Sequence, residues 1–336
     1  MPPRALRHLP LFLGGIGALA LCAALSLALG ARSVPLPTVL DALSGPTESR
    51  DALVVTGLRL PRTVIGLAVG AALGVAGAVT QGITRNPLAS PTTLGINAGA
   101  GFAVVVAIFA LKLTDPVEYV WFAFTGAAGA AGAAGAAVLA QALARRAGDI
   151  DPVRLALGGT VLQLVLLSWT SAVMLASLRT LDEARFWPAG SIAGRQLETV
   201  CPVLPTLVLV LLLAGAVAPA LNALALGDDS AQVLGVPVTR IRLAGGIAVV
   251  LLAGSAVAVA GPVAFVGLAA PHLVSPLLGG DHRLLVPGCL IVGPLLLLTA
   301  DILGRLVIRP AELEVGIVTA FLGAPLLALL ARKVAR

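Results

Sequence analysis

The chain has 336 residues, of which 58% are hydrophobic and only 11% charged, with a mean hydropathy of +1.03. Soluble domains are about half apolar and a quarter charged, so this composition excludes an ordinary soluble domain. The formal net charge of +6 comes from arginines scattered between apolar runs, not from a basic block of the kind that binds nucleic acid. Only a helical bundle or a closed barrel satisfies its backbone in lipid. Long apolar runs without alternation, such as 207–218, favour helices.

Ten apolar segments are long enough, or nearly long enough, to cross a membrane as helices. They are 11–31, 62–83, 93–112, 119–143, 153–177, 198–221, 240–260, 263–279, 284–306 and 314–331. The first resembles a signal peptide but has no clear cleavage site, so we expect a retained span. The eighth is short and contains Pro271 and Pro276, which indicates a half-helix or a re-entrant segment. We therefore predict an all-α, polytopic membrane protein with a single domain over 1–336.

Charge predicts how these spans are oriented. An even number of spans places both termini on the same side of the membrane. If that side is the cytoplasm, the inner segments carry twelve of the 22 Lys and Arg residues but only five of the 16 acidic residues. Basic residues favour cytoplasmic loops. We expect a multi-pass protein of the bacterial inner membrane with cytoplasmic termini, an orientation that net charge favours more than the count of basic residues does.

Small residues line the second span at every fourth position. They are Gly66, Gly70, Gly74, Ala78 and Gly82. Since lipid offers no hydrophobic drive for helix association, small residues allow the close packing that replaces it. We expect neighbouring helices to approach this face closely, and the Gly- and Ala-rich stretch 126–137 to act in the same way in the fourth span.

Three connecting segments are long enough to fold. On the outer side, 33–61 is rich in proline and polar residues, and 179–197 is expected to form a short interfacial helix anchored by Phe186 and Trp187. On the inner side, 222–237 has a helix-start signal at 227–229 and a turn signal at 235–237. This pattern predicts two short cytoplasmic helices.

The sequence gives little indication of enzymatic activity or of a metal site. Cys22, Cys201 and Cys289 are not spaced as a metal site or a disulfide framework. A phosphate-binding loop needs Gly-Lys followed by Ser or Thr, but the only lysines, Lys112 and Lys333, follow Leu and Arg. The chain is therefore not expected to hydrolyse ATP.

Ionisable residues within spans are candidates for function. Asp301 and Arg305 are four residues apart, which places them on one helix face as an intramembrane ion pair. His272 is more simply explained as a hydrogen-bonded residue near Asp281, although a proton relay of His272 and Asp301 would suit a proton-coupled secondary transporter. An intramembrane hydrolase built on Ser168 lacks an orienting acid.

Four segments resemble the permeases of ATP-binding-cassette importers for iron siderophores, haem and cobalamin. They are 59–101, 221–237, 261–283 and 300–325, and they occur in the order of that family. The stretch RFWPAGS at 185–191 is most similar to the ferric-enterobactin type of permease. The resemblance implies a type II importer permease that carries a ferric siderophore of the catecholate type, with haem or cobalamin as the alternative cargo.

The same resemblance implies the partners. Two permeases would form the central path, with a heterodimer favoured over a homodimer. Two cytoplasmic ATPase subunits would hold ATP and Mg, so this chain needs no cofactor and no metal of its own. A periplasmic or lipid-anchored binding protein would deliver the siderophore.

The resemblance also assigns candidate site residues. Asn86, Pro87 and Leu88 match the cytoplasmic gate, whose second half near 151–153 departs from the cobalamin permease and stays open. The coupling segment that docks into the ATPase matches at four positions, Asp228, Ala231, Leu234 and Gly235.

Three outer arginines match positions that meet glutamates of the binding protein. They are Arg59, Arg62 and Arg305. Arginine on the outer side works against the inside-positive rule, and a guanidinium group suits bidentate pairing with carboxylates. The alternatives are contact with lipid headgroups and pairing with Asp301 inside the subunit.

Overall fold

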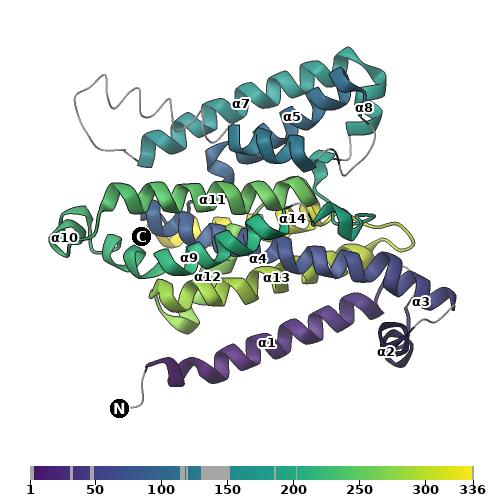
Figure 1. Cartoon of the computed structure of the whole chain (residues 1–336), viewed down its shortest axis with the longest axis horizontal. Helices are drawn as coiled ribbons and strands as arrows, with labels where there is room; N and C mark the ends of the chain where they lie inside the picture. The colour runs from purple at the N-terminus through teal and green to yellow at the C-terminus, as the bar shows by residue number, and fades with distance from the viewer. Residues whose placement is uncertain are drawn as a thin grey trace.

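The computed structural model describes residues 4–30, 33–45, 49–113, 118, 120–129, 152–184, 187–201 and 203–334, and within these ranges every regular element is a helix (Figure 1). The longer helices are α1 (Arg4–Ala28), α4 (Leu60–Thr84), α5 (Ile96–Leu111), α7 (Pro152–Ala176), α9 (Leu204–Leu224), α11 (Val238–Ala260), α12 (Val266–Leu278), α13 (His282–Val307) and α14 (Val315–Val334). The shorter ones are α2 (Leu36–Ser44), α3 (Arg50–Val54), a π-helical turn η1 (Val55–Arg59), η2 (Pro91–Leu94), α8 (Leu178–Ala184), η3 (Trp187–Ala189), η4 (Leu197–Thr199) and α10 (Asp228–Val233).

The helices account for all ten predicted spans. Within the described residues, six helices are long and apolar enough to cross a membrane: those in α1, α7, α9, α11, α13 and the continuous stretch Arg50–Thr84. Four shorter apolar helices, Ile96–Leu111, Val120–Gly129, Val266–Leu278 and Val315–Pro325, fall in the other predicted spans. The prediction of an all-α polytopic membrane protein is confirmed, while part of the fourth span, 119–143, lies outside the described residues.

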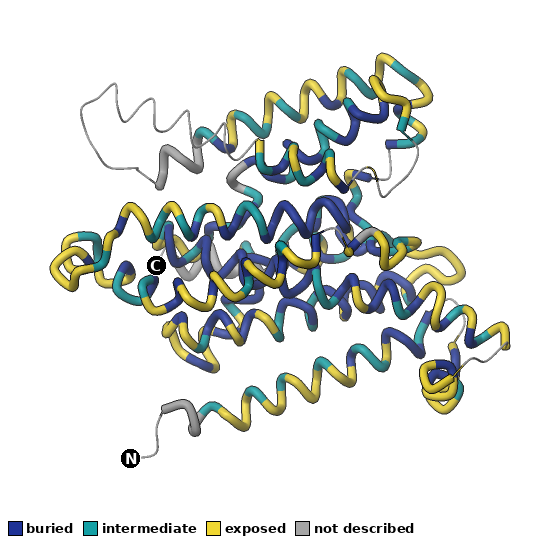
Figure 2. Tube along the Cα trace, in the orientation of Figure 1, coloured by how far each residue is buried: buried dark blue, intermediate teal, exposed yellow. Residues whose placement is uncertain are grey.

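Helix α4 lies at the centre of the bundle and is mostly buried, whereas α1 and α7 at the periphery expose much of their surface (Figure 2). A Cβ atom at Gly70 would lie 2.5 Å from the Cα atom of Pro294, and one at Gly74 would lie 2.6 Å from the carbonyl oxygen of Cys289. Only glycine allows the backbones of α4 and α13 to approach this closely. The predicted close packing along the small-residue face of α4 is confirmed.

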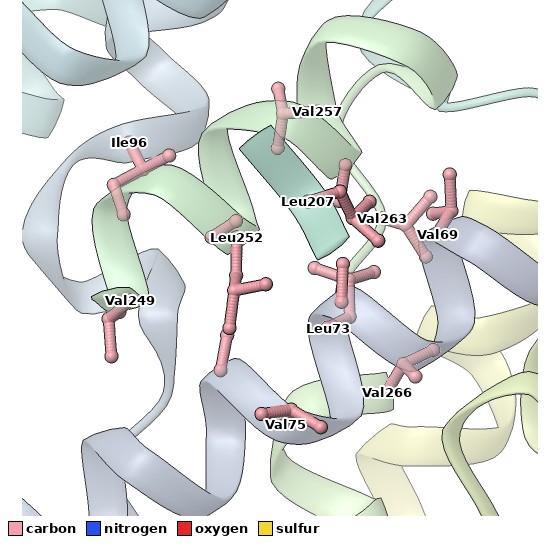
Figure 3. Close-up of a cluster of buried hydrophobic side chains, with 14 of the residues drawn as sticks. Val69, Leu73, Val75, Ile96, Leu207, Val249, Leu252, Val257, Val263 and Val266 are labelled. Atoms are coloured by element: carbon pink, nitrogen blue, oxygen red, sulfur yellow. The ribbon is translucent and has the colours of Figure 1, made fainter. Parts of the chain in front are cut away.

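Branched aliphatic side chains fill the space between α4 and its other neighbours. Figure 3 shows Val69 and Leu73 of α4 beside Leu207 of α9 and Val263, which precedes α12. Leu252 of α11 belongs to the same buried cluster. These contacts hold the middle of α4, and the candidate sites lie at its two ends.

Helix α12 is a short element that reaches only part of the way across a bilayer. It has 13 residues and follows a turn in which Gly261 and Phe265 have φ angles of 71° and 68°. At 1.5 Å per residue it spans about 20 Å, against about 30 Å of hydrocarbon. This length agrees with the half-helix expected from Pro271 and Pro276, both of which lie inside α12.

The connecting segments differ in detail from the sequence-based expectations. Helix α8 and η3 occupy part of 179–197, but Trp187 is not an exposed anchor: it is buried and its ring lies against Gly101 of α5. Phe186 lies outside the described residues. The segment 222–237 holds one short helix, α10, instead of two, because α9 continues through Leu224 and uses the first part of the segment.

The connecting helices gather at the two ends of the bundle. Helix α10 and the beginning of α1 lie at one end, and α2, α3 and α8 lie at the other (Figure 1). We refer to these as the α10 end and the α2 end.

Candidate functional site

The predicted gate residues form a tight turn at the α10 end, directly after α4. Arg85 ends α4 with a φ angle of 51°, a left-handed conformation that is rare for residues other than glycine. The Asn86 side-chain oxygen accepts a hydrogen bond from the Leu88 backbone N–H at 2.9 Å, and the Asn86 carbonyl accepts one from Ala89 N–H at 3.1 Å. Asn86 and Pro87 are exposed and Leu88 is half-buried. The three residues are thus held in one stiff, accessible turn.

The second half of the predicted gate lies where the described part of α7 begins. Asp151 is outside the described residues, and the first two residues of α7, Pro152 and Val153, follow it directly.

Two glycines delimit α10. Gly227 precedes the helix with a φ angle of 104°, and Gly235 follows it with a φ angle of 78°. Gly235 N–H donates to the Gln232 carbonyl at 2.9 Å and Val236 N–H donates to the Ala231 carbonyl at 3.0 Å. This pair of bonds is a Schellman motif, in which the residue at the position of Gly235 must be left-handed. Gly235 therefore terminates the helix, and any side chain there would strain the backbone.

Three large apolar side chains are exposed in and beside α10. Leu226, which precedes the helix, Val233, its last residue, and Leu234, which follows it, are 66%, 88% and 63% exposed at the α10 end of the bundle. Of the four residues predicted for coupling, only Leu234 belongs to this apolar group. Ala231 is fully buried, and Asp228 is turned toward the bundle. Sequence reasoning missed Leu226 and Val233, although two large apolar side chains in a segment with helix-capping acids were a usable signal.

Asp228 joins three elements through its carboxylate. Arg242 of α11 contacts both carboxylate oxygens, with Nη1 2.9 Å from Oδ2 and Nη2 2.9 Å from Oδ1. Arg85 Nη2 lies 3.3 Å from Oδ1. The first residue of α10 is therefore ion-paired with the last turn of α4 and with the beginning of α11.

A second polar contact near the α10 end ties α9 to α13. The Asn222 side-chain oxygen accepts from His282 N–H at 2.8 Å, and its amide donates to Asp281 Oδ1 at 2.6 Å. Asp281 is the N-cap of α13 and also accepts from the Arg283 backbone N–H at 2.9 Å. Hydrogen bonds from Arg283 N–H and from the Asn222 amide hold the pKa of Asp281 below its usual range.

At the α2 end, charged side chains form a buried cluster around Asp301. Asp301 is completely buried; its Oδ1 lies 2.7 Å from Arg62 Nη2 and its Oδ2 lies 2.8 Å from Arg305 Nη2. The predicted pair of Asp301 and Arg305 is present, one helical turn apart on α13. Arg62 also contacts Glu312 Oε2 at 2.6 Å. Each buried charge has an opposite charge beside it, as burial requires.

The same arginines hold the end of α1. Arg305 Nη1 donates to the carbonyls of Ser26 and Leu29 at 2.9 and 2.8 Å, and Arg59 Nη1 donates to those of Leu27 and Ala28 at 2.8 Å each. These carbonyls belong to the last turn of α1 and to the residue after it, where a helix leaves its carbonyls without intrahelical partners. Sequence reasoning missed this role, because nothing in the spacing brings residues 26–29 near residue 305.

The structure thus gives the three arginines of the predicted docking site partners inside the chain. Arg59, Arg62 and Arg305 are 7%, 9% and 2% exposed. A carboxylate of another protein reaches them only if they give up these bonds. Docking through them stays a prediction.

His272 and Asp301 have separate partners. His272 is hydrogen-bonded, as expected: its ring Nδ1 lies 2.8 Å from the carbonyl oxygen of Leu268, one turn back on α12. Asp301 is bound to arginines. Among the described residues there is also no group of three or more His, Cys, Asp or Glu side chains that could hold a metal ion.

An open apolar hollow of about 750 Å³ lies beside the beginning of α14. Pro188 of η3, Pro262, and Ile317 and Phe321 of α14 contribute to its wall, which carries no charged side chain. Such a surface offers no ligand for a bare cation, and it suits an apolar helix or the apolar part of a large chelate.

Comparison with known proteins identifies the family that has this architecture. The model of the FecCD transport family matches residues 18–333. The chain belongs to the FecCD transport family. It is therefore the membrane-spanning permease of an ATP-binding-cassette importer for iron chelates, is not itself an enzyme, and, like other such subunits, carries no cofactor.

Individual relatives cover nearly the whole chain. The ferric enterobactin transport system permease protein FepD of Escherichia coli is 44% identical over 95% of this chain and 93% of its own length. The Fe(3+)-citrate import system permease protein YfmD of Bacillus subtilis is 39% identical over 96% of this chain and 92% of its own. A solved structure, an inward-facing conformation of a putative metal-chelate type transporter, superposes with a TM-score of 0.81 at 28% identity and covers 96% of this chain and 99% of that one. The fold is therefore that of a type II importer permease.

Proposed function

We propose that this permease carries a ferric siderophore of the catecholate type across the bacterial inner membrane. The observation that carries the proposal is the 44% identity to the ferric enterobactin permease of E. coli, which extends over 95% of the chain. Relatives named for ferric citrate and ferric hydroxamate are 39% and 37% identical, so those chelates are the second candidates. The apolar hollow without charged groups fits a large chelate better than free iron.

Uptake by cells tests the cargo. A strain that lacks its own ferric-siderophore permeases but keeps one ATPase and one binding protein for each chelate would express this chain with a second permease. We expect radioactive iron to accumulate when supplied as ferric enterobactin. Uptake of ferric citrate or ferric hydroxamate in preference to enterobactin would contradict the catecholate proposal, and uptake of haem or cobalamin alone would contradict iron transport.

We also propose that the partner in the membrane is a second, different permease. The ferric enterobactin proteins FepD and FepG of E. coli are 44% and 37% identical to this chain, and each is named a permease of that one system. The ferric dicitrate permeases FecD and FecC, 39% and 34% identical, form a similar pair of names. Co-expression with tagged copies would recover the different permease. Recovery of two copies of this chain as an active complex would favour the homodimer.

We propose that the α10 end faces the cytoplasm and that the exposed apolar residues in and beside α10 dock into the ATPase. Leu226, Val233 and Leu234 leave much of their apolar surface uncovered by the residues that the structure describes. Surface patches of this kind mark protein interfaces. Charge favours the same orientation, because most of the basic residues and few of the acids belong to this side in the predicted topology.

A pull-down tests this surface. Val233→Glu together with Leu234→Glu should abolish co-purification of the ATPase, because two carboxylates would be buried without partners in an apolar groove. Gln232→Glu is the matched control, since it places the same charge at an exposed position of the same helix. Equal recovery of the ATPase with the wild type, the double variant and Gln232→Glu would contradict docking through Val233 and Leu234.

We also propose that an external binding protein docks at the α2 end. Its test uses Arg59→Gln, which removes the charge of the arginine that holds the carbonyls of Leu27 and Ala28. Charged groups at the rim of an interface act mainly on the association rate and its salt dependence. A slower, less salt-dependent association of the binding protein would support contact with Arg59; an unchanged rate and salt slope would leave Arg59 with its internal role only.

A further inference from the structure

We propose that Asp228 is a positioning residue that links α10 to the gate turn through Arg85, and that it does not itself contact the ATPase. The inference rests on the proposed coupling role of α10 and deepens it. It assigns different tasks to two groups of residues: the exposed apolar side chains Leu226, Val233 and Leu234 receive the ATPase, and the Asp228 carboxylate at the beginning of the helix passes its movement to the membrane-spanning helices.

The geometry places the Asp228 carboxylate between the elements and not on the outer surface. Its two oxygens are held by Arg242 at 2.9 Å each, and Oδ1 is shared with Arg85 at 3.3 Å. The side chain is 26% exposed, whereas neighbouring Asp229 is exposed and forms no ion pair among the described residues. Two adjacent acids therefore differ: Asp228 faces inward to two arginines, and Asp229 faces water.

Arg85 is well placed to transmit a displacement. It is the residue directly before Asn86, and its left-handed φ of 51° is one that surrounding contacts must maintain in a non-glycine residue. The guanidinium group reaches the beginning of α10 while the backbone begins the turn in which Asn86 holds Leu88 N–H at 2.9 Å. A shift of the Asp228 carboxylate therefore acts on the residue that sets the direction of the gate turn.

Glycines flank helix α10 on both sides. Gly227 and Gly235 bracket it with φ angles of 104° and 78°, and a Cβ atom at Gly235 would meet nothing within 4 Å. Backbone changes at such glycines cost less than elsewhere. Buried Ala231 and the ion pairs of Asp228 tie the helix to the bundle, while Val233 and Leu234 remain outside. A displacement of Val233 and Leu234 would thus be transmitted to the bundle through Ala231 and Asp228.

Asp228→Asn tests the link in the assembled permease–ATPase complex in nanodiscs. Amide hydrogen exchange at Leu88 and Ala89 reports the gate turn, and the number of chelates transported per ATP reports coupling. We expect exchange to become about fivefold faster, the size that loss of a partly exposed ion pair usually gives, and transport per ATP to fall while the ATPase still co-purifies. Asp228→Glu, which keeps a carboxylate, should restore coupling.

Asp229→Asn is the matched control, because it removes the same charge from the same helical turn and should change none of these readouts. Equal behaviour of Asp228→Asn and Asp229→Asn would overturn the inference. So would loss of the ATPase from Asp228→Asn with unchanged exchange at Leu88, since Asp228 would then be a docking contact. Such a loss would not contradict the proposal that the apolar residues dock into the ATPase. That proposal is contradicted separately if Val233→Glu with Leu234→Glu retains the ATPase.

Discussion

Removal of Asp301 should be among the most damaging single changes to the stability of this permease. The carboxylate is completely buried, with Arg62 Nη2 at 2.7 Å and Arg305 Nη2 at 2.8 Å. Asp301→Ala leaves two nearly buried guanidinium groups with Glu312 as the nearby acid. Breaking a buried ion pair by deleting one partner costs about 3–5 kcal/mol. Because Arg305 also holds the last turn of α1, loosening it should free that end of the helix.

Glu312→Gln supplies the matched comparison. Glu312 also contacts Arg62, but its side chain is one-third exposed, so solvent screens the pair. Its loss should cost about 1 kcal/mol or less. Unfolding in mixed lipid–detergent micelles with increasing denaturing detergent would measure both variants against the wild type. A cost for Asp301→Ala no larger than that for Glu312→Gln would refute the reasoning that these charges are buried and mutually dependent.

Three further predictions concern the α10 end and the topology. Liposomes that contain the double variant Asn86→Ala with Leu88→Ala should release a trapped chelate without ATP, because the turn loses its internal hydrogen bond and its half-buried side chain. If they retain the chelate as well as wild-type liposomes do, these residues form a structural turn and not a gate. Native Cys201 is exposed whereas Cys22 and Cys289 are buried, so an impermeant thiol reagent should label Cys201 in intact spheroplasts, and labelling from the cytoplasmic side alone would reverse the orientation. The pKa of Asp281 is depressed, so its charge stabilises the folded protein above the usual carboxyl pKa, and that contribution is lost as pH falls through the lower folded value. The difference in stability between the wild type and Asp281→Asn should therefore be constant near neutral pH and shrink below about pH 4 in detergent unfolding. A difference that persists at low pH would contradict the assignment.

The sequence predicted the parts of this protein that depend on local pattern. Apolar length located the spans, and the four-residue spacing of small residues on α4 predicted that neighbouring helices approach this face closely, as α13 does. The i,i+4 spacing of Asp301 and Arg305 predicted their ion pair. These features follow from segment length and from spacing along a single helix; which helix packs against α4 did not.

The parts that sequence reasoning missed depend on contacts between distant segments. The pairing of Arg305 with the carbonyls of Ser26 and Leu29 joins residues more than 270 positions apart. Motif matching likewise could not tell which residues of 222–237 face outward. It selected buried Ala231 and helix-terminating Gly235, but passed over Leu226 and Val233. Family motifs mark positions that matter without saying whether they act through contact, packing or backbone conformation.

Reconstituted transport tests the central claim, that this chain is the permease of an ATP-driven iron-chelate importer. The chain, a second permease and the ATPase would be placed in liposomes with ATP inside, and the binding protein loaded with ferric enterobactin would be added outside. We expect the chelate to accumulate inside only when ATP can be hydrolysed, with no effect of collapsing a proton gradient. Accumulation that needs the proton gradient and persists without ATP would contradict the account and favour a secondary transporter.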